Sequence, residues 1–137
     1  MQRLMALYLN GQFLKFLAAG GLAALANFAS RFVFEWSMSY EAAVVLAYLV
    51  GFATAFTLNR IFVFPASSKP LRHEISWFFL FNVLAFPVVV GAATVLTGLF
   101  ARSMPLAHAK TAAHGIAIML PVFVNFAAHK FITFGKR

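Results

Sequence analysis

The sequence predicts an all-α integral membrane protein whose four transmembrane helices form two hairpins. The first observation is composition: of the 137 residues, 63% are hydrophobic and 10% are charged, whereas soluble domains carry about a quarter charged residues. The second is a series of four long apolar runs separated by short polar segments. The third is a motif that recurs along the chain, NRIFVF at residues 59–64 and HKFITF at residues 129–134. A soluble core of this size cannot hide so many apolar side chains, so lipid is the expected solvent.

The expected helices cover about residues 13–34, 42–61, 75–101 and 108–130 of a single membrane domain, residues 1–137. Each run has at least the ~20 residues that cross the hydrocarbon core at 1.5 Å per residue. A cleaved signal peptide is the alternative for the first run, but its apolar part is too long for one. In the second run, Ala47, Gly51 and Ala55 recur every fourth residue and predict a face for close helix packing.

A polar segment at residues 65–72, with two prolines, two serines and two cations, divides the chain into halves. If all four runs cross the membrane, this segment and both termini lie on one side. Of the 11 lysines and arginines, that side holds Arg3, Lys15, Arg60, Lys69, Arg72, Lys130, Lys136 and Arg137. The other side holds Arg31, Arg102 and Lys110. The positive-inside rule therefore places both termini in the cytoplasm and predicts a multi-pass protein of the cytoplasmic (inner) membrane.

Each half starts and ends on the same side, so the two hairpins are predicted to be parallel repeats related by an axis along the membrane normal. Each begins with an aromatic stretch and ends with the recurring motif of a polar residue, a cation and an apolar run. Four helices leave little room for an aqueous path inside one copy. We therefore expect a homodimer.

Several classes of function are disfavoured by the residues that the chain lacks. There are no cysteines, and the four histidines are too scattered for a metal site. Since no acid–base pair and no activated nucleophile is evident, we expect neither an enzyme nor a cofactor. The net charge of +8 comes from cations at the ends of apolar runs. It indicates an anionic membrane surface as the partner and not nucleic acid.

Three stretches of the chain resemble the GtrA-like family of small four-helix membrane proteins. The run GGLAALANFASR at residues 20–31 resembles the family's first helix. The motifs LNRIFVF at residues 58–64 and NFAAHKFITF at residues 125–134 resemble the closing motifs of its second and fourth helices. The start of the fourth helix at Ala109 and Lys110 is also similar. One departure is Lys130, where arginine is common, and it follows His129 in place of a serine or an asparagine.

The resemblance implies a role in cell-surface polysaccharide or glycan synthesis, as a translocator (flippase) of polyprenyl-phosphate-linked sugars. Such a lipid needs cations for its phosphate, hydrogen-bonding groups for its sugar and an apolar opening for its tail. We expect Arg60 and Lys130 to meet the phosphate on the cytoplasmic side, and Arg31 and Lys110 to receive it on the far side. Hydrogen bonds are expected from Asn27, Asn59 and Asn125.

Simpler interpretations of these cations remain open. Arg31 could extend to the far interface and pair with Glu35, one turn further along the helix. Lys110 could be an interfacial anchor, and Arg60 and Lys130 could serve only the positive-inside rule. The alternative function is that of a non-transporting anchor or partner of a membrane glycosyltransferase. A small multidrug-type exporter would need a deep acidic residue in the first helix, where this chain has Asn27.

Overall fold

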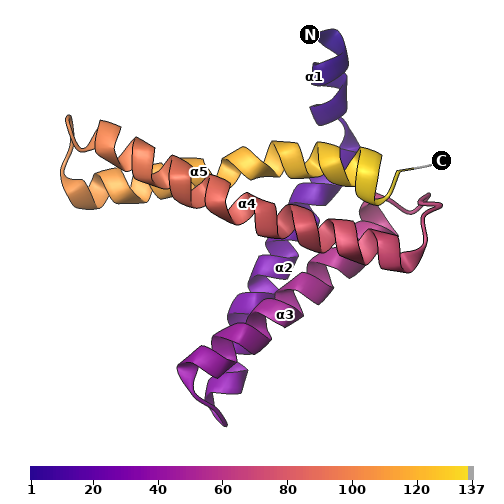
Figure 1. Ribbon diagram of the computed structural model, residues 1–137, viewed down its shortest axis with the longest axis horizontal. Helices are drawn as coiled ribbons and strands as arrows, with labels where there is room; N and C mark the ends of the chain where they lie inside the picture. The colour runs from indigo at the N-terminus through magenta and orange to yellow at the C-terminus, as the bar shows by residue number, and fades with distance from the viewer. Residues whose placement is uncertain (136–137) are drawn as a thin grey trace. The chain divides into compact units, whose positions relative to one another are not determined.

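The computed structural model describes residues 1–135, and this part of the chain is helical, with no strand (Figure 1). It divides into two compact units, Met1–Ser67 and Ser68–Arg137. Lys136 and Arg137, counted above among the cytoplasmic cations, lie outside the described residues. That the whole chain forms a single domain stays a prediction.

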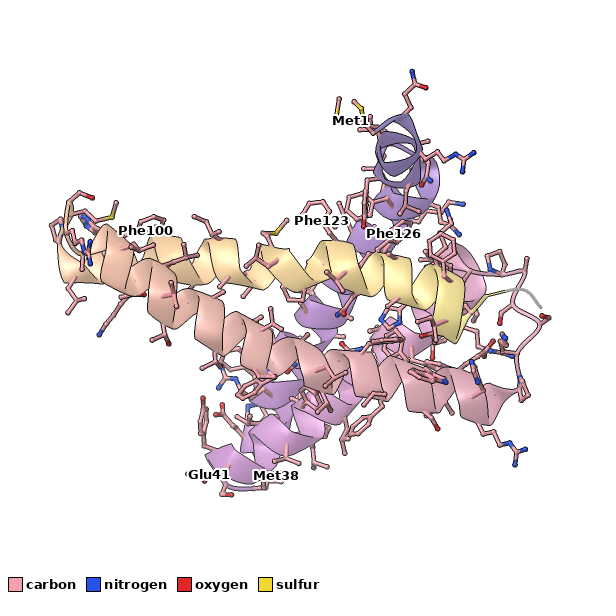
Figure 2. All side chains as sticks on the ribbon, turned by 45° about the horizontal axis from the view of Figure 1, so that its top comes forward. Met1, Met38, Glu41, Phe100, Phe123 and Phe126 are labelled. Carbon is pink, nitrogen blue, oxygen red and sulfur yellow. The ribbon has the colours of Figure 1, made fainter. Side chains whose placement is uncertain are left out.

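The first unit is a helical hairpin preceded by a short helix. It comprises α1 (Gln2–Tyr8), α2 (Gly11–Glu35), α3 (Tyr40–Leu58) and the π-helical turn η1 (Asn59–Val63). Side chains cap both long helices: Asn10 accepts a hydrogen bond from the N–H of Phe13 at 2.9 Å, and Ser39 accepts one from the N–H of Ala42 at 3.3 Å. These caps satisfy amide groups that have no partner within the helix. α2 and α3 lie side by side (Figure 1), and Met38 and Glu41 mark the turn that joins them (Figure 2).

The second unit is a longer hairpin of α4 (Leu71–Phe100) and α5 (Leu106–Ala128), closed by the π-helical turn η2 (His129–Thr133). Each of its helices starts directly after a proline, Pro70 or Pro105, whose ψ of 144° or 142° is extended. The fixed φ of proline favours such a boundary. Phe100 lies near the turn between the two helices (Figure 2).

Four helical segments in residues 1–135 are long and apolar enough to cross a membrane, as the sequence predicts. They are Gly11–Glu35, Tyr40–Val63, Leu71–Phe100 and Leu106–Thr133, of 24 to 30 residues. Such lengths correspond to about 36–45 Å, which exceeds the ~30 Å hydrocarbon core. In the most apolar part of each segment, at most 22% of the residues are buried inside the protein, so most of these side chains are open to lipid. The prediction of a four-helix integral membrane protein is therefore confirmed, whereas the orientation of the termini stays a prediction.

Small residues line the seam where each second helix packs. In α3, Ala43, Ala47 and Gly51 are buried, and Ala55 is half-buried. The positions 70 residues later in α5 are also buried: Ala113, Ala117 and Pro121. A Cβ atom added at Gly51 would lie 2.8 Å from Cβ of Asn27 and 3.3 Å from the carbonyl oxygen of Ala23, both in α2. The packing face predicted from the spacing of small residues is therefore confirmed.

Candidate functional site

The repeated sequence motif forms the same backbone structure in both units. Each copy ends its helix in a π turn, η1 or η2. The N–H of Phe64 donates to the carbonyl of Asn59 at 2.8 Å, and the N–H of Phe134 donates to the carbonyl of His129 at 2.9 Å. Each of these hydrogen bonds joins residues five positions apart in the sequence, whereas the hydrogen bonds of an α-helix join residues four positions apart. Turns of this kind are rare and occur frequently at functional sites, which makes both copies candidates for function.

The polar residue that opens each turn is buried. Asn59 is 2% exposed and His129 is 1% exposed. Nδ2 of Asn59 donates to the carbonyl of Ala55 at 2.7 Å, whereas Oδ1 has no hydrogen-bond partner among residues 1–135. A buried acceptor left without a partner costs about 1–3 kcal/mol. Asn59, which the sequence suggests as a hydrogen-bonding contact for a substrate, is therefore enclosed by protein.

His129 belongs to an aromatic cluster in the second unit. Its ring stacks on Phe78 with 4.5 Å between the ring centroids, and Phe81 meets it edge-on at 5.8 Å. Nδ1 of His129 lies 3.0 Å from Oγ1 of Thr133, four residues further along the same turn. The two turns therefore share a backbone path but differ in their anchor, an amide in η1 and a stacked imidazole in η2.

The cation that follows each anchor is less buried than the anchor itself. Arg60 in η1 is exposed and Lys130 in η2 is half-buried. The ammonium nitrogen of Lys130 lies 5.6 Å from the ring centroid of Phe126, within the range of a cation–π attraction. Each turn thus buries one polar side chain and follows it with a positively charged side chain that is at least partly exposed.

Side chains from the first helix of each hairpin fasten the π turns. Nε2 of Gln12 donates to the carbonyl of Val63 at 2.8 Å, and Nε2 of His73 lies 3.1 Å from the carbonyl oxygen of Ile132. Carbonyls at the end of a helix have no partner within it, so these contacts act as caps from a distant part of the chain. Neither Gln12 nor His73 belongs to the set of site residues predicted from the sequence. Their one signal is that each is a polar residue in the first turn of an apolar helix.

Arg31 already has partners in the first unit. One guanidinium nitrogen lies 2.9 Å from Oε1 of Glu35, with the two side chains 21% and 26% exposed. The guanidinium carbon lies 4.2 Å from the ring centroid of Phe32 and 5.5 Å from that of Tyr40. The pairing with Glu35 that the sequence suggests is present. A phosphate would have to compete with this carboxylate for Arg31.

Two of the predicted asparagines lie within the helices and are half-buried. Asn27 packs across the seam against Gly51. Asn125 in α5 accepts the backbone N–H of His129 with its carbonyl, at the point where the α-helix becomes a π turn. Asn27 is therefore at a packing position, four residues before Arg31, and Asn125 lies where α5 becomes η2, the turn that carries Lys130.

Lys110 lines a shallow pocket of about 400 Å³ between α4 and α5, together with Ala93, Thr94, Thr97 and His114. Lys110 and His114 share a face of α5, as their spacing of four predicts. The two threonines come from α4 and are absent from the set predicted from sequence. The pocket thus offers one cation and an imidazole to an anionic group, whereas the hydroxyl of Thr94 already donates to the carbonyl of Val90 at 2.9 Å.

The predicted residues of each unit fall into two groups. In the first unit, Asn59 and Arg60 lie in η1, whereas Arg31 lies beside Tyr40 at the α2–α3 turn. In the second unit, Lys130 lies in η2, and Lys110 lies near the start of α5. Among residues 1–135, no group of three or more His, Cys, Asp or Glu side chains lies close enough together to hold a metal ion.

The fold and the repeated turns define a polytopic helical membrane protein built from two hairpins. The family described as "GtrA/DPMS, transmembrane domain" matches residues 15–134, which is most of the chain, and the protein therefore belongs to that family. This membership suggests involvement in the handling of polyprenyl-phosphate-linked sugars. The chain is also similar to the uncharacterized membrane protein YwcD of Bacillus subtilis (strain 168). The two are 27% identical over 126 residues, which cover 88% of this chain and 94% of the relative. No solved structure matches the chain.

Proposed function

We propose that this protein moves polyprenyl-phosphate-linked sugars across the membrane for the synthesis of a cell-surface polysaccharide or glycan. The observation that carries the proposal is the pair of π turns, in which a buried anchor precedes an at least partly exposed cation at the end of each hairpin. A cation held there suits an anionic phosphate. The exposed apolar flanks of the helices suit the lipid tail. Family membership supports the same class of substrate.

In this proposal Arg60 and Lys130 contact the phosphate on the side where the lipid enters. Arg60 can present two N–H donors to one phosphate, whereas Lys130 acts as a point charge. Because their anchors differ as well, the two turns would bind with unequal strength. The excess of positive charge around the π turns supports placing them and both termini on the cytoplasmic side of the cytoplasmic membrane.

Arg31 and Lys110 are proposed to receive the phosphate on the opposite side. Arg31 would exchange the carboxylate of Glu35 for the phosphate, and Lys110 would hold it in the pocket that Thr94 and Thr97 share. Hydrogen bonds to the substrate would come from Asn27 and Asn125, which are half-buried, whereas the enclosed Asn59 would hold the η1 turn in place. We further propose that the protein works as a homodimer, that it leaves its substrate chemically unchanged, and that lipid moves down its own gradient as the sugar is consumed.

The test is a flipping assay in liposomes that contain the purified protein and a fluorescent polyprenyl-phosphate sugar. Dithionite added outside quenches the label in the outer leaflet, so the rate of further loss measures flipping. We expect flipping to be faster than in empty vesicles. Equal rates in protein-containing and empty vesicles would refute the proposal.

The contribution of the cations is tested with single variants in the same vesicles. Arg60→Ala should slow flipping about tenfold, because loss of one charge-assisted contact is worth about 1.5 kcal/mol or more. Lys130→Arg should retain the activity. Arg102→Ala removes an exposed cation outside the proposed site and serves as the matched control. Arg31→Ala should slow flipping but should still co-purify with any glycosyltransferase that binds the wild type. If Arg31→Ala has no effect, the partner role is favoured instead.

A further inference from the structure

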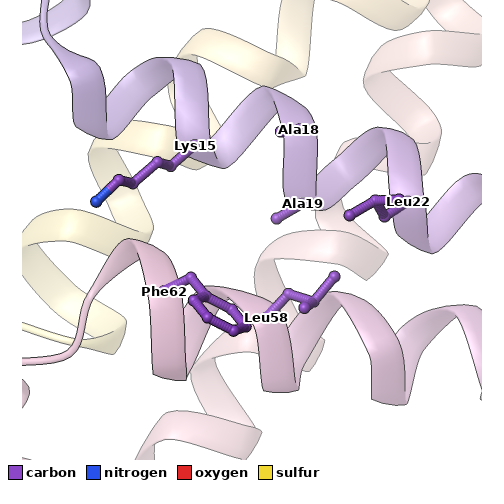
Figure 3. Close-up of a pocket in the computed structure, with 6 residues that line it drawn as sticks. All are labelled: Lys15, Ala18, Ala19, Leu22, Leu58 and Phe62. Atoms are coloured by element: carbon purple, nitrogen blue, oxygen red, sulfur yellow. The ribbon is translucent and has the colours of Figure 1, made fainter.

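An apolar groove runs along the first hairpin between α2 and the end of the second helix (Figure 3). Its volume is about 190 Å³, and its lining comprises Lys15, Ala18, Ala19, Leu22, Leu58 and Phe62. This volume is below the ~300–1,000 Å³ of pockets that enclose a whole drug-sized ligand. The groove therefore fits a short length of a chain. Its lining side chains offer no hydroxyl or amide group for a sugar.

One cation stands at the end of this groove. Figure 3 shows the side chain of Lys15 extending from α2 at the end where Phe62 lies, while Ala19, Leu22 and Leu58 continue the groove away from it. Lys15 is exposed, as are Leu22 and Phe62. The groove thus combines an open apolar channel with one positive charge at its end, which complements a chain that carries an anion at its end.

The groove adjoins the first π turn. Phe62 is part of η1 and lies two residues after Arg60. One turn before Lys15 in α2, Gln12 donates to the carbonyl of Val63 in the same η1. Lys15 and Arg60 therefore belong to the same end of this hairpin, and the groove leads from that end along the helices.

We propose that this groove binds the phosphate-proximal isoprene units of a polyprenyl phosphate and that Lys15 pairs with the phosphate. The inference rests on the proposed function and adds to it a tail-binding channel and a cation outside the set predicted from sequence. The occupant follows from charge and shape: an apolar chain fills the groove and its terminal anion meets the ammonium group. Ala18 and Ala19 leave room for a methyl-branched chain where larger side chains would fill it.

The experiment uses the full-length protein in nanodiscs and a polyprenyl phosphate with a photoreactive diazirine in its first isoprene unit. After illumination, mass spectrometry should locate the adducts on Leu22, Leu58 or Phe62. Ala18→Phe should lower labelling at least tenfold because the new ring occupies the groove. Ala24→Phe is the matched control, since Ala24 is exposed on α2 and outside the groove, and it should leave labelling unchanged.

The charge at the end of the groove is tested separately. Lys15→Ala should weaken binding about tenfold, as expected for the loss of one charge-assisted contact to phosphate, and Lys15→Arg should restore it. Arg102→Ala removes the same charge elsewhere and should leave binding unchanged. The corresponding polyprenol lacks the phosphate and should label the groove of the wild type only weakly. Its labelling should be as weak as that of the Lys15→Ala variant by the polyprenyl phosphate.

Three outcomes would overturn the proposal. One is labelling outside the groove, the second is labelling that neither Ala18→Phe nor Lys15→Ala reduces, and the third is equal labelling by a diazirine phosphatidylglycerol, which marks an ordinary membrane lipid. The flipping assay separates this inference from the proposed function. Labelled groove residues without flipping would refute transport alone, and flipping without labelled groove residues would refute the groove alone.

Discussion

Replacing Gly51 with alanine should push α2 and α3 apart and destabilise the first hairpin. The added Cβ would lie 2.8 Å from Cβ of Asn27 and 3.3 Å from the carbonyl oxygen of Ala23. Carbon atoms pack best at about 3.5–4.0 Å, so the two Cβ atoms would have to separate by about 0.7–1.2 Å. Overpacking of this kind costs about 1–3 kcal/mol, which lowers the folding equilibrium constant by roughly 5-fold to more than 100-fold.

The assay is equilibrium unfolding by sodium dodecyl sulfate in mixed micelles, followed by far-ultraviolet circular dichroism. Gly20→Ala and Gly115→Ala are matched controls, because a Cβ at either position meets nothing within 4 Å. These controls should be neutral or more stable by up to about 1 kcal/mol, since alanine favours a helix. Adding Asn27→Gly to Gly51→Ala should restore part of the stability. Unfolding of Gly51→Ala at the same detergent fraction as the controls would contradict the close packing of α2 against Gly51.

Three further variants probe other contacts. Gln12→Ala removes the donor to the carbonyl of Val63, so it should cost about 1 kcal/mol and speed hydrogen exchange in the first π turn, as measured by mass spectrometry. His129→Ala removes a buried, stacked ring and should destabilise the protein by about 3 kcal/mol in the detergent titration. Glu35→Gln releases Arg31 from an ion pair of a kind that contributes about 0.2–1 kcal/mol. It should barely change stability but should lower the lipid concentration that half-saturates flipping.

Each of these variants has a control with the same chemical change at an exposed position: Gln2→Ala, His108→Ala and Glu41→Gln. The controls should stay within about 0.5 kcal/mol of the wild type. If the amide hydrogens of the first π turn exchange no faster in Gln12→Ala than in Gln2→Ala, the hydrogen bond from Gln12 is not needed to hold that turn. If His129→Ala is as stable as His108→Ala, the stacking of His129 on Phe78 does not stabilise the second unit. If Glu35→Gln lowers the free energy of unfolding by more than about 2 kcal/mol, the small contribution expected of the ion pair between Arg31 and Glu35 is contradicted.

The four membrane helices and the packing face of α3 could be predicted because both depend on local sequence patterns. An apolar run of sufficient length must form a helix in lipid, where each backbone group needs a partner within its own segment. The spacing of Ala47 and Gly51 places them on one face whatever lies opposite. What the sequence did not show is that Asn27 of α2 is the residue that packs against Gly51.

The π turns could not be predicted, because a chain that ends an α-helix and one that widens into a π turn have similar local sequences. The expected helices ended near residues 61 and 130, whereas helical structure continues to Val63 and Thr133. The recurrence of the motif 70 residues later was the available signal, but it did not specify the backbone. The inward direction of Asn59 and His129 depends on tertiary packing. For that reason polarity alone suggested substrate contact for Asn59, where the structure shows an enclosed side chain.

The two fastening contacts have a consequence for biosynthesis. Gln12 and Val63 are separated by 51 positions, and His73 and Ile132 by 59, so each contact closes a loop within one hairpin. All partners of the first loop have been synthesised before most of α4 leaves the ribosome. The first hairpin can therefore lock in the bilayer while the second is still being made. Insertion then proceeds one hairpin at a time. Loss of one fastening contact should delay the folding of only the hairpin that contains it.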